Sequence, residues 1–211
     1  MFEAERLDHI HFSKIRKVFE EVNALEEKGY KVIHFEIGKP DFDTPEHIKE
    51  GAKKALDAGH VHYTSNYGLY KLRESISRKL YEDNNLSYNP ENEIIVTLGV
   101  TEGLFISLMA LVNPEEEVII LEPSFPQYKY AVRMAGGVPK SVQTKEEDQF
   151  IPDKENIEKN ITSKTKGIII NSPNNPTGCV YSKEDLEDLA EIAQKYNLFV
   201  ISDEIYEKLI Y

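Results

Sequence analysis

Residues 167–178 read GIIINSPNNPTG, an apolar run that gives way abruptly to asparagines, prolines and a glycine. Runs of the same apolar kind occur at 94–97 (IIVT), 118–121 (VIIL) and 199–202 (FVIS). Strands that are covered on both faces have to be apolar almost throughout. Segments with a helical spacing of apolar residues separate these runs, at about 102–112, 127–135 and 183–196. This alternation predicts a three-layer α/β/α fold with a mostly parallel sheet.

The segments outside these runs complete the expected element order. Residues 13–28 predict an amphipathic helix, and residues 32–37 predict a short strand. Further helices are expected at about 45–58 and 69–83, and a weaker strand at 138–143. The chain stops at Tyr211, soon after the 199–202 run, and no helix follows to cover that strand. We therefore expect a sheet that is incomplete at its C-terminal end, in a piece of a longer protein or in a chain that needs a partner.

The composition excludes several classes of protein. The 211 residues include 25 Lys and Arg against 37 Asp and Glu, which gives a formal net charge of −12. Such acidity argues against nucleic acid and against anionic membrane surfaces as partners. The apolar runs are only a few residues long, whereas a membrane span needs ~20. The single cysteine, Cys179, excludes an intrachain disulfide and a metal site built from several cysteines. With no signal peptide visible at the charged N-terminus, we expect a cytoplasmic protein.

Ligands of open α/β sheets bind where the strands end, so the segments after the apolar runs form the candidate site. Gly99, Val100 and Thr101 lie between a predicted strand and a helix, where backbone N–H groups and the helix dipole favour a phosphate. Phe125 stands between two prolines in the next such loop, from which it could stack on a planar ring. Each segment also has a purely structural interpretation, as a helix cap in the first case and a core aromatic in the second.

The last two segments carry the polar groups. Asn175 belongs to a rigid loop with two adjacent amides, although such a loop could satisfy its amides locally. Asp203 ends an apolar strand, and a carboxylate there is costly unless a cation or a protonated heterocycle faces it. Tyr206 follows three residues later, on the same side if the chain makes a helical turn. The alternative is that Asp203 caps a helix and that the Tyr206 side chain packs against the protein. Together the four segments describe one ligand, with a phosphate, a ring, a hydroxyl and a ring nitrogen, and this description fits pyridoxal phosphate.

The chain resembles the N-terminal half of a fold-type-I, class I aminotransferase of the aspartate/aromatic/alanine aminotransferase group. The resemblance spans nearly the whole chain. Its most specific part is the pair Asn-Ser-Pro-Asn-Asn-Pro-Thr-Gly and Ser-Asp-Glu-Ile-Tyr, in the family's order and spacing. The matching segments are Gly38–Pro45, Tyr63-Thr64 with Gly68, Gly99–Thr101, Pro123–Phe125, Asn171–Gly178 and Ser202–Tyr206.

The resemblance implies a role for each matching residue. Gly99, Val100 and Thr101 would hold the cofactor's phosphate, and Phe125 would stack on its ring. Asn175 and Tyr206 would hydrogen-bond the ring hydroxyl, and Asp203 would pair with the ring nitrogen. Gly38, together with Asn175, would lie against the substrate. Tyr63 would reach the phosphate of the neighbouring subunit in a homodimer. The implied catalytic residues of this chain are Asp203 and Tyr206.

The resemblance also divides the chain and exposes a departure from the family. Residues 1–45 would be an N-terminal arm and a segment of the small domain, and residues 46–211 part of the large, cofactor-binding domain. The family's Schiff-base lysine follows a further strand, which would begin after Tyr211. Lys14, Lys164 and Lys183 follow serines but precede the Asp203 strand, and the local pattern around Lys208 is wrong. The 211-residue chain alone is therefore expected to be inactive.

The implied activity is transfer of an amino group from an L-amino acid to a 2-oxo acid. The sequence does not name the substrate, because the side-chain pocket would be shared with the C-terminal part. Alternatives on the same scaffold are a carbon–sulfur lyase or another pyridoxal phosphate enzyme. A non-catalytic truncated fragment remains open as well. A nucleotide-binding protein is disfavoured, because neither Gly-x-Gly-x-x-Gly nor a P-loop lysine pattern is present.

Overall fold

The computed structural model describes residues 4, 7, 10, 14–35, 38 and 40–211. The expected N-terminal arm lies mostly outside these residues, as does the end of the strand expected at 32–37. The described chain divides into two compact units. One comprises residues 98–211 with the few described residues before 12, and the other comprises residues 14–97. The domain boundary expected at 45/46 stays a prediction.

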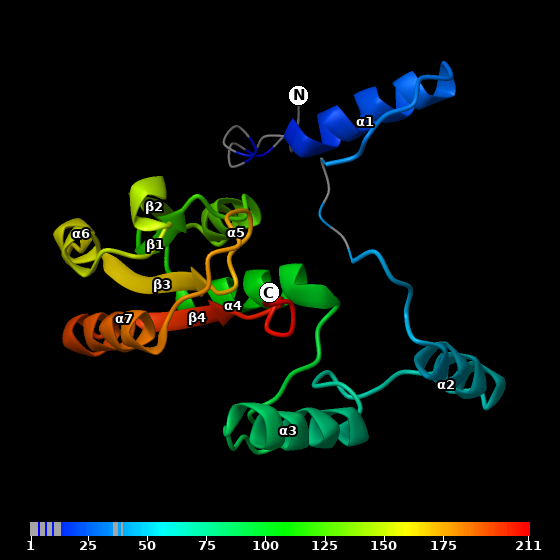
Figure 1. Cartoon of the computed structure of the whole chain (residues 1–211). Helices are drawn as coiled ribbons and strands as arrows, with labels where there is room; N and C mark the ends of the chain where they lie inside the picture. Colours follow the sequence, from blue (N-terminus) through cyan, green and yellow to red (C-terminus); the bar gives the residue numbers. More distant parts are fainter. Residues whose placement is uncertain (1–3, 5–6, 8–9, 11–13, 36–37, 39) are drawn as a thin grey trace. The chain divides into compact units, whose positions relative to one another are not determined.

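The first unit is built on a four-stranded sheet in the order β2-β1-β3-β4 (Figure 1). The strands are β1 (Glu117–Glu122), β2 (Val138–Gln143), β3 (Thr165–Asn171) and β4 (Phe199–Asp203). Every neighbouring pair in this sheet is parallel, as predicted. The weaker strand expected at 138–143 is therefore confirmed. Because all four strands run the same way, their carboxyl ends lie at one edge of the sheet.

Helices cover both faces of this sheet. They are α4 (Gly99–Leu111), α5 (Gln127–Met134), α6 (Lys154–Asn160) and α7 (Lys183–Tyr196), with a short 3-10 helix, η2 (Glu146–Asp148), after β2. Val118 and Ile120 of β1 pack in one cluster with buried residues of α4 and α5. Ile119 and Leu121 pack in a second cluster with residues of α6 and α7. Alternate residues of a strand point to opposite faces, so both sets have to be apolar. The three-layer α/β/α prediction is confirmed.

The second unit contains α1 (Lys14–Glu27), α2 (Glu46–Asp57) and α3 (Tyr70–Asn84). Two predicted strands are wrong: residues 32–35 and 94–97 belong to no strand. An apolar run becomes a strand only when a neighbouring strand supplies hydrogen bonds. No described strand pairs with either segment, and the Val96 N–H donates instead to the Tyr67 carbonyl, at 3.1 Å.

A buried arginine organises the end of this unit. Arg73 is only 6% exposed. Its guanidinium donates to the carbonyl oxygens of Gly68 (3.3 Å), Glu91 (3.1 Å) and Pro90, and it stacks near the rings of Tyr67 and Tyr70. A buried charge is tolerated when its donors are satisfied in this way. Arg73 thereby fastens the start of α3 to residues 90–91.

Gly167 lets β4 pack closely against β3. It lies opposite Phe199 in the strand register, and a Cβ atom at position 167 would overlap the Phe199 ring. Gly167→Ala is therefore expected to lower the free energy of unfolding by about 1–3 kcal/mol, the usual cost of overpacking. Urea denaturation followed by circular dichroism measures this change.

Gly51→Ala is the matched control, because Gly51 lies in α2 and a Cβ atom placed on it would have nothing within 4 Å. That substitution should be neutral or stabilising by up to about 1 kcal/mol, since alanine favours a helix more than glycine does. Equal effects of the two substitutions would contradict the packing assigned to Gly167.

Candidate functional site

The carboxyl edge of the sheet carries the segments that the sequence singled out. The loop after β1 holds Phe125 and leads into α5, and the loop after β3 holds Asn175. Asp203 is the last residue of β4, and Tyr206 lies in the turn that follows. The start of α4 completes the group. Parallel pairing thus gathers segments that are separated by up to about a hundred residues of sequence.

A cavity of about 250 Å³ lies among these segments. Ligand cavities usually begin at ~300 Å³, so this volume approaches the lower end of that range. Six of the predicted site residues line it, and three further residues complete the lining. The predicted residues are Val100, Thr101, Phe125, Asn175, Asp203 and Tyr206, and the others are Tyr128, Asn171 and Ile205.

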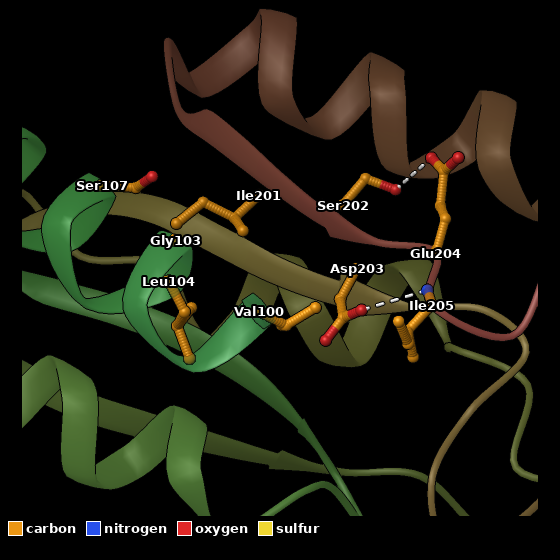
Figure 2. Close-up of a pocket in the computed structure, with 9 residues that line it drawn as sticks. All are labelled: Val100, Gly103, Leu104, Ser107, Ile201, Ser202, Asp203, Glu204 and Ile205. Carbon is orange, nitrogen blue, oxygen red and sulfur yellow. Dashed lines mark hydrogen bonds between the residues drawn. The ribbon is translucent and has the colours of Figure 1, made fainter. Parts of the chain in front are cut away.

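A second cavity of about 250 Å³ adjoins the first along Val100, Asp203 and Ile205, which line both. Figure 2 shows this second cavity between α4 and the end of β4, with Val100 and Leu104 on the helix side and Ile201 on the strand side. Asp203 is therefore accessible from two adjoining hollows at the carboxyl edge of the sheet.

Asp203 is held in place by three hydrogen bonds. Its Oδ1 accepts from the Ile205 N–H at 3.2 Å, a bond that is drawn in Figure 2. Its Oδ2 accepts from the Tyr128 hydroxyl at 2.7 Å. Its backbone carbonyl accepts from the Asn171 side-chain amide at 2.9 Å. The sequence predicted a cation or a protonated heterocycle as the partner of this carboxylate. Within the described chain its partners are neutral donors, and the side chain still faces the cavity.

Asn175 and Tyr206 are neighbours in the lining of the cavity. The Asn175 side-chain amide donates to the Tyr206 hydroxyl at 3.3 Å. The Asn175 backbone N–H donates to Asn171 Oδ1 at 2.8 Å, which fixes the loop against the end of β3. The two side chains thus present an amide and a hydroxyl together, the pair of groups that can hydrogen-bond a single ligand oxygen.

The start of α4 has the chemistry of an anion site. Gly99 is the first residue of the helix and has a positive φ of 78°, with nothing within 4 Å of a Cβ placed there. The first N–H groups of a helix have no partner inside it, and the dipole makes this end positive. Backbone N–H groups of Val100 and Thr101 belong to this first turn. They fit a phosphate at the cavity's edge.

Phe125 contributes an aromatic face. Its ring packs on the apolar cluster that α4 and α5 form with the sheet, and it also lines the cavity. The Tyr128 ring meets it edge-on, with centroids 5.7 Å apart and an interplanar angle of 81°. The Phe125 side chain therefore packs on the core and also reaches the cavity, and its stacking on a ring stays a prediction.

Sequence reasoning missed Tyr128 and Asn171. Tyr128 is 2% exposed, and burial together with its hydrogen bond to Asp203 raises the pKa of its phenol, which stays protonated as a donor. Its position three residues after Phe125 was the available signal. Asn171 is 3% exposed and is the first polar residue after three isoleucines. A polar side chain at the end of an apolar run is the same signal that singled out Asp203.

Two predicted site residues lie in the other unit. Gly38 is exposed, with nothing within 4 Å of a Cβ placed on it, and Tyr63 is fully exposed. Their proposed contacts with substrate and with a neighbouring subunit stay predictions. Lys208 follows Tyr206 in the chain but lines neither of the two cavities.

The Asn171 side chain joins the ends of β3 and β4, so its loss should be costly. In Asn171→Asp the new side chain still accepts from Asn175 but places an acceptor against the Asp203 carbonyl. We expect a loss of about 1–3 kcal/mol in the free energy of unfolding, because the half-buried Asp203 carbonyl loses its donor. Urea denaturation measures it.

Asn156→Asp is the matched control for this substitution. Asn156 makes the same kind of bond, from its side-chain amide to the Gln143 carbonyl at 3.0 Å, in an exposed setting. Its replacement should cost less than about 0.5 kcal/mol, as surface substitutions usually do. If Asn171→Asp were equally mild, the joining role of Asn171 would be wrong.

Comparison with known proteins adds independent information on this arrangement. The family model for class I and class II aminotransferases matches residues 30–211. An aspartate aminotransferase from Pyrococcus abyssi is 47% identical over 208 residues, which cover 99% of this chain and 52% of the relative. An aromatic-amino-acid aminotransferase from Thermococcus litoralis is 42% identical, with the same coverage of both chains.

A solved structure gives the same result. The aspartate aminotransferase from Thermus thermophilus with maleate has a TM-score of 0.96 and 42% identity, and the match covers 100% of this chain and 55% of that one. The chain thus spans about half the length of the relatives it matches. Among the residues that the structure describes, no helix is both long and apolar enough to cross a membrane.

Proposed function

We propose, from the premise that this chain belongs to the class I and class II aminotransferase family, that it is the N-terminal part of a pyridoxal-phosphate-dependent aminotransferase. The complete enzyme would move an amino group from an L-amino acid to a 2-oxo acid. The observation that carries this proposal is the cavity at the carboxyl edge, where Asp203, Asn175, Tyr206 and Phe125 meet the start of α4.

The residues of this cavity fit the cofactor group by group. The first turn of α4 suits a phosphate, and Phe125 offers a flat face to a ring. The Asn175 amide and the Tyr206 hydroxyl suit a ring oxygen, and the Asp203 carboxylate suits a protonated ring nitrogen. When bound, the cofactor supplies an electron sink for the carbanion that forms at the amino acid's α carbon.

The chain's own part in the reaction would be to bind and orient. Asp203 would hold a proton at the ring nitrogen, since a carboxylate stabilises the positive charge there. Asn175 and Tyr206 would fix the ring's rotation through its hydroxyl. Phe125 would cover one face of the ring and exclude water from it. Gly38 would lie against the substrate carboxylate, and Asn175 would also face the substrate.

The choice of activity rests on the relatives. Those compared above are named aspartate and aromatic-amino-acid aminotransferases, which favours transamination over a carbon–sulfur lyase. The lysine that binds the cofactor covalently in this family would lie beyond residue 211, so residues 1–211 alone would be inactive. A cytoplasmic location and the domain boundary at 45/46 belong to the same proposal.

Asp203→Asn tests the role of the carboxylate. In the full-length enzyme we expect kcat to fall by about a hundredfold or more, the scale of losing one electrostatic contact to the reacting group. The fold should survive, because asparagine has nearly the same size and its one side-chain oxygen can take the place of Oδ2 and accept from the Tyr128 hydroxyl. Steady-state kinetics and circular dichroism measure the two effects.

Asp148→Asn is the control for Asp203→Asn, because Asp148 lies on η2 and pairs only loosely with Lys145, at 4.0 Å. It should leave kcat unchanged. Near-normal turnover of the Asp203→Asn enzyme would remove Asp203 from the cofactor site and with it the main support of this proposal.

A homodimer is the expected assembly, with Tyr63 near the partner's site. The Tyr63 side chain is fully exposed in this chain, and symmetric dimers are the commonest assemblies. Sedimentation of the full-length protein with pyridoxal phosphate should give the mass of two chains. A monomer under these conditions would contradict the expected role of Tyr63.

A further inference from the structure

Tyr128 links two residues that the cofactor would touch on different sides. It lies in the first turn of α5, and its hydroxyl donates to Asp203 Oδ2 at the end of β4, at 2.7 Å. Its ring meets the Phe125 ring edge-on, at 5.7 Å between centroids. Only 2% of its surface is exposed, although it lines the cavity. One buried side chain therefore contacts both the carboxylate and the aromatic face of the site.

The hydrogen bond to Tyr128 limits how the Asp203 carboxylate can rotate. Oδ1 accepts from the Ile205 N–H, and Oδ2 accepts from the Tyr128 hydroxyl. An ionised carboxylate has about four acceptor positions, so capacity remains for a donor in the cavity. Without the tyrosine hydroxyl, a single backbone bond would hold the side chain, and the group could turn about its terminal torsion.

Tyr128 is suited to act as a constant donor. Burial raises the pKa of its phenol, and the neighbouring Asp203 carboxylate raises it further. Tyr206 and Tyr181 are the other titratable groups that act on it, and both act in the same direction. The phenol therefore keeps its proton near neutral pH, where it can donate to Asp203.

We propose that Tyr128 is a positioning residue that aims the Asp203 carboxylate at the cofactor's ring nitrogen. This inference deepens the proposed function and rests on it. Tyr128 itself would touch neither the reacting atoms nor the substrate amine. Its effect would be specific for the ring nitrogen, because it acts through the one residue that faces that atom.

The first test compares two cofactors in the full-length protein. One is pyridoxal phosphate, and the other is an analogue in which C–H replaces the ring nitrogen. The wild type should bind pyridoxal phosphate more tightly than the analogue. In Tyr128→Phe this preference should fall by about tenfold, the scale of a hydrogen bond to a charged group, with binding of the analogue nearly unchanged.

Tyr181→Phe is the matched control. Tyr181 is also a buried tyrosine, but it packs in the apolar cluster on the opposite face of the sheet and does not line the cavity. Its substitution should leave the preference as in the wild type. Equal losses for both cofactors in Tyr128→Phe would mean a merely structural role, and an unchanged preference would also overturn the inference.

The second test needs neither cofactor nor the Tyr128 variant. In cofactor-free protein with ¹³C-labelled tyrosine, NMR follows each phenol as the pH rises. The Tyr128 signal should stay in its protonated position beyond the pH at which an ordinary phenol ionises. In Asp203→Asn the pKa of Tyr128 should fall, because a negative neighbour is lost. An unchanged pKa would refute the contact on which the inference rests.

These experiments separate the inference from the proposed function. If the wild type does not bind pyridoxal phosphate, the proposed function fails and the inference fails with it. If the wild type binds and discriminates against the analogue, and Tyr128→Phe discriminates equally well, the proposed function stands and the inference alone is wrong.

Discussion

The parallel pairing of β3 with β4 places Asn171 opposite Asp203, and the site depends on this register. A shift of one residue would turn every side chain of β4 to the other face of the sheet. Contacts at both ends of the paired strands hold this register. Gly167 leaves room for the Phe199 ring at one end, and the Asn171 amide bonds to the Asp203 carbonyl at the other.

The same constraint separates the apolar part of the sheet from the polar part. The central strands β1 and β3 are covered on both faces, so their middle residues are isoleucine, valine and leucine. Polar side chains appear where the strands end, and those that end β3 and β4 are hydrogen-bonded. Asn171 bonds to Asn175 and Asp203, and Asp203 bonds to Tyr128 and Ile205. The result is a set of oriented groups around a cavity.

Much of this arrangement could be predicted from the sequence, for physical reasons. A strand that is buried on both faces has a distinctive composition, and parallel strands bring their carboxyl ends together, so Phe125, Asn175 and Asp203 were expected at one place. The run at 94–97 has the same composition, but a strand also needs a partner, and pairing is not a local property. Its Val96 N–H bonds to a turn instead. Tyr128 was missed because its spacing of three residues from Phe125 does not tell a tyrosine that stays in the core from one whose hydroxyl reaches a distant carboxylate.

The proposed role of Asp203 is to hold a proton on the ring nitrogen of pyridoxal phosphate. The most direct measurement is ¹⁵N NMR of the full-length protein loaded with cofactor labelled at that nitrogen. We expect the signal of a protonated ring nitrogen near neutral pH, and its loss in Asp203→Asn. The signal of an unprotonated ring nitrogen in the wild type would contradict the account.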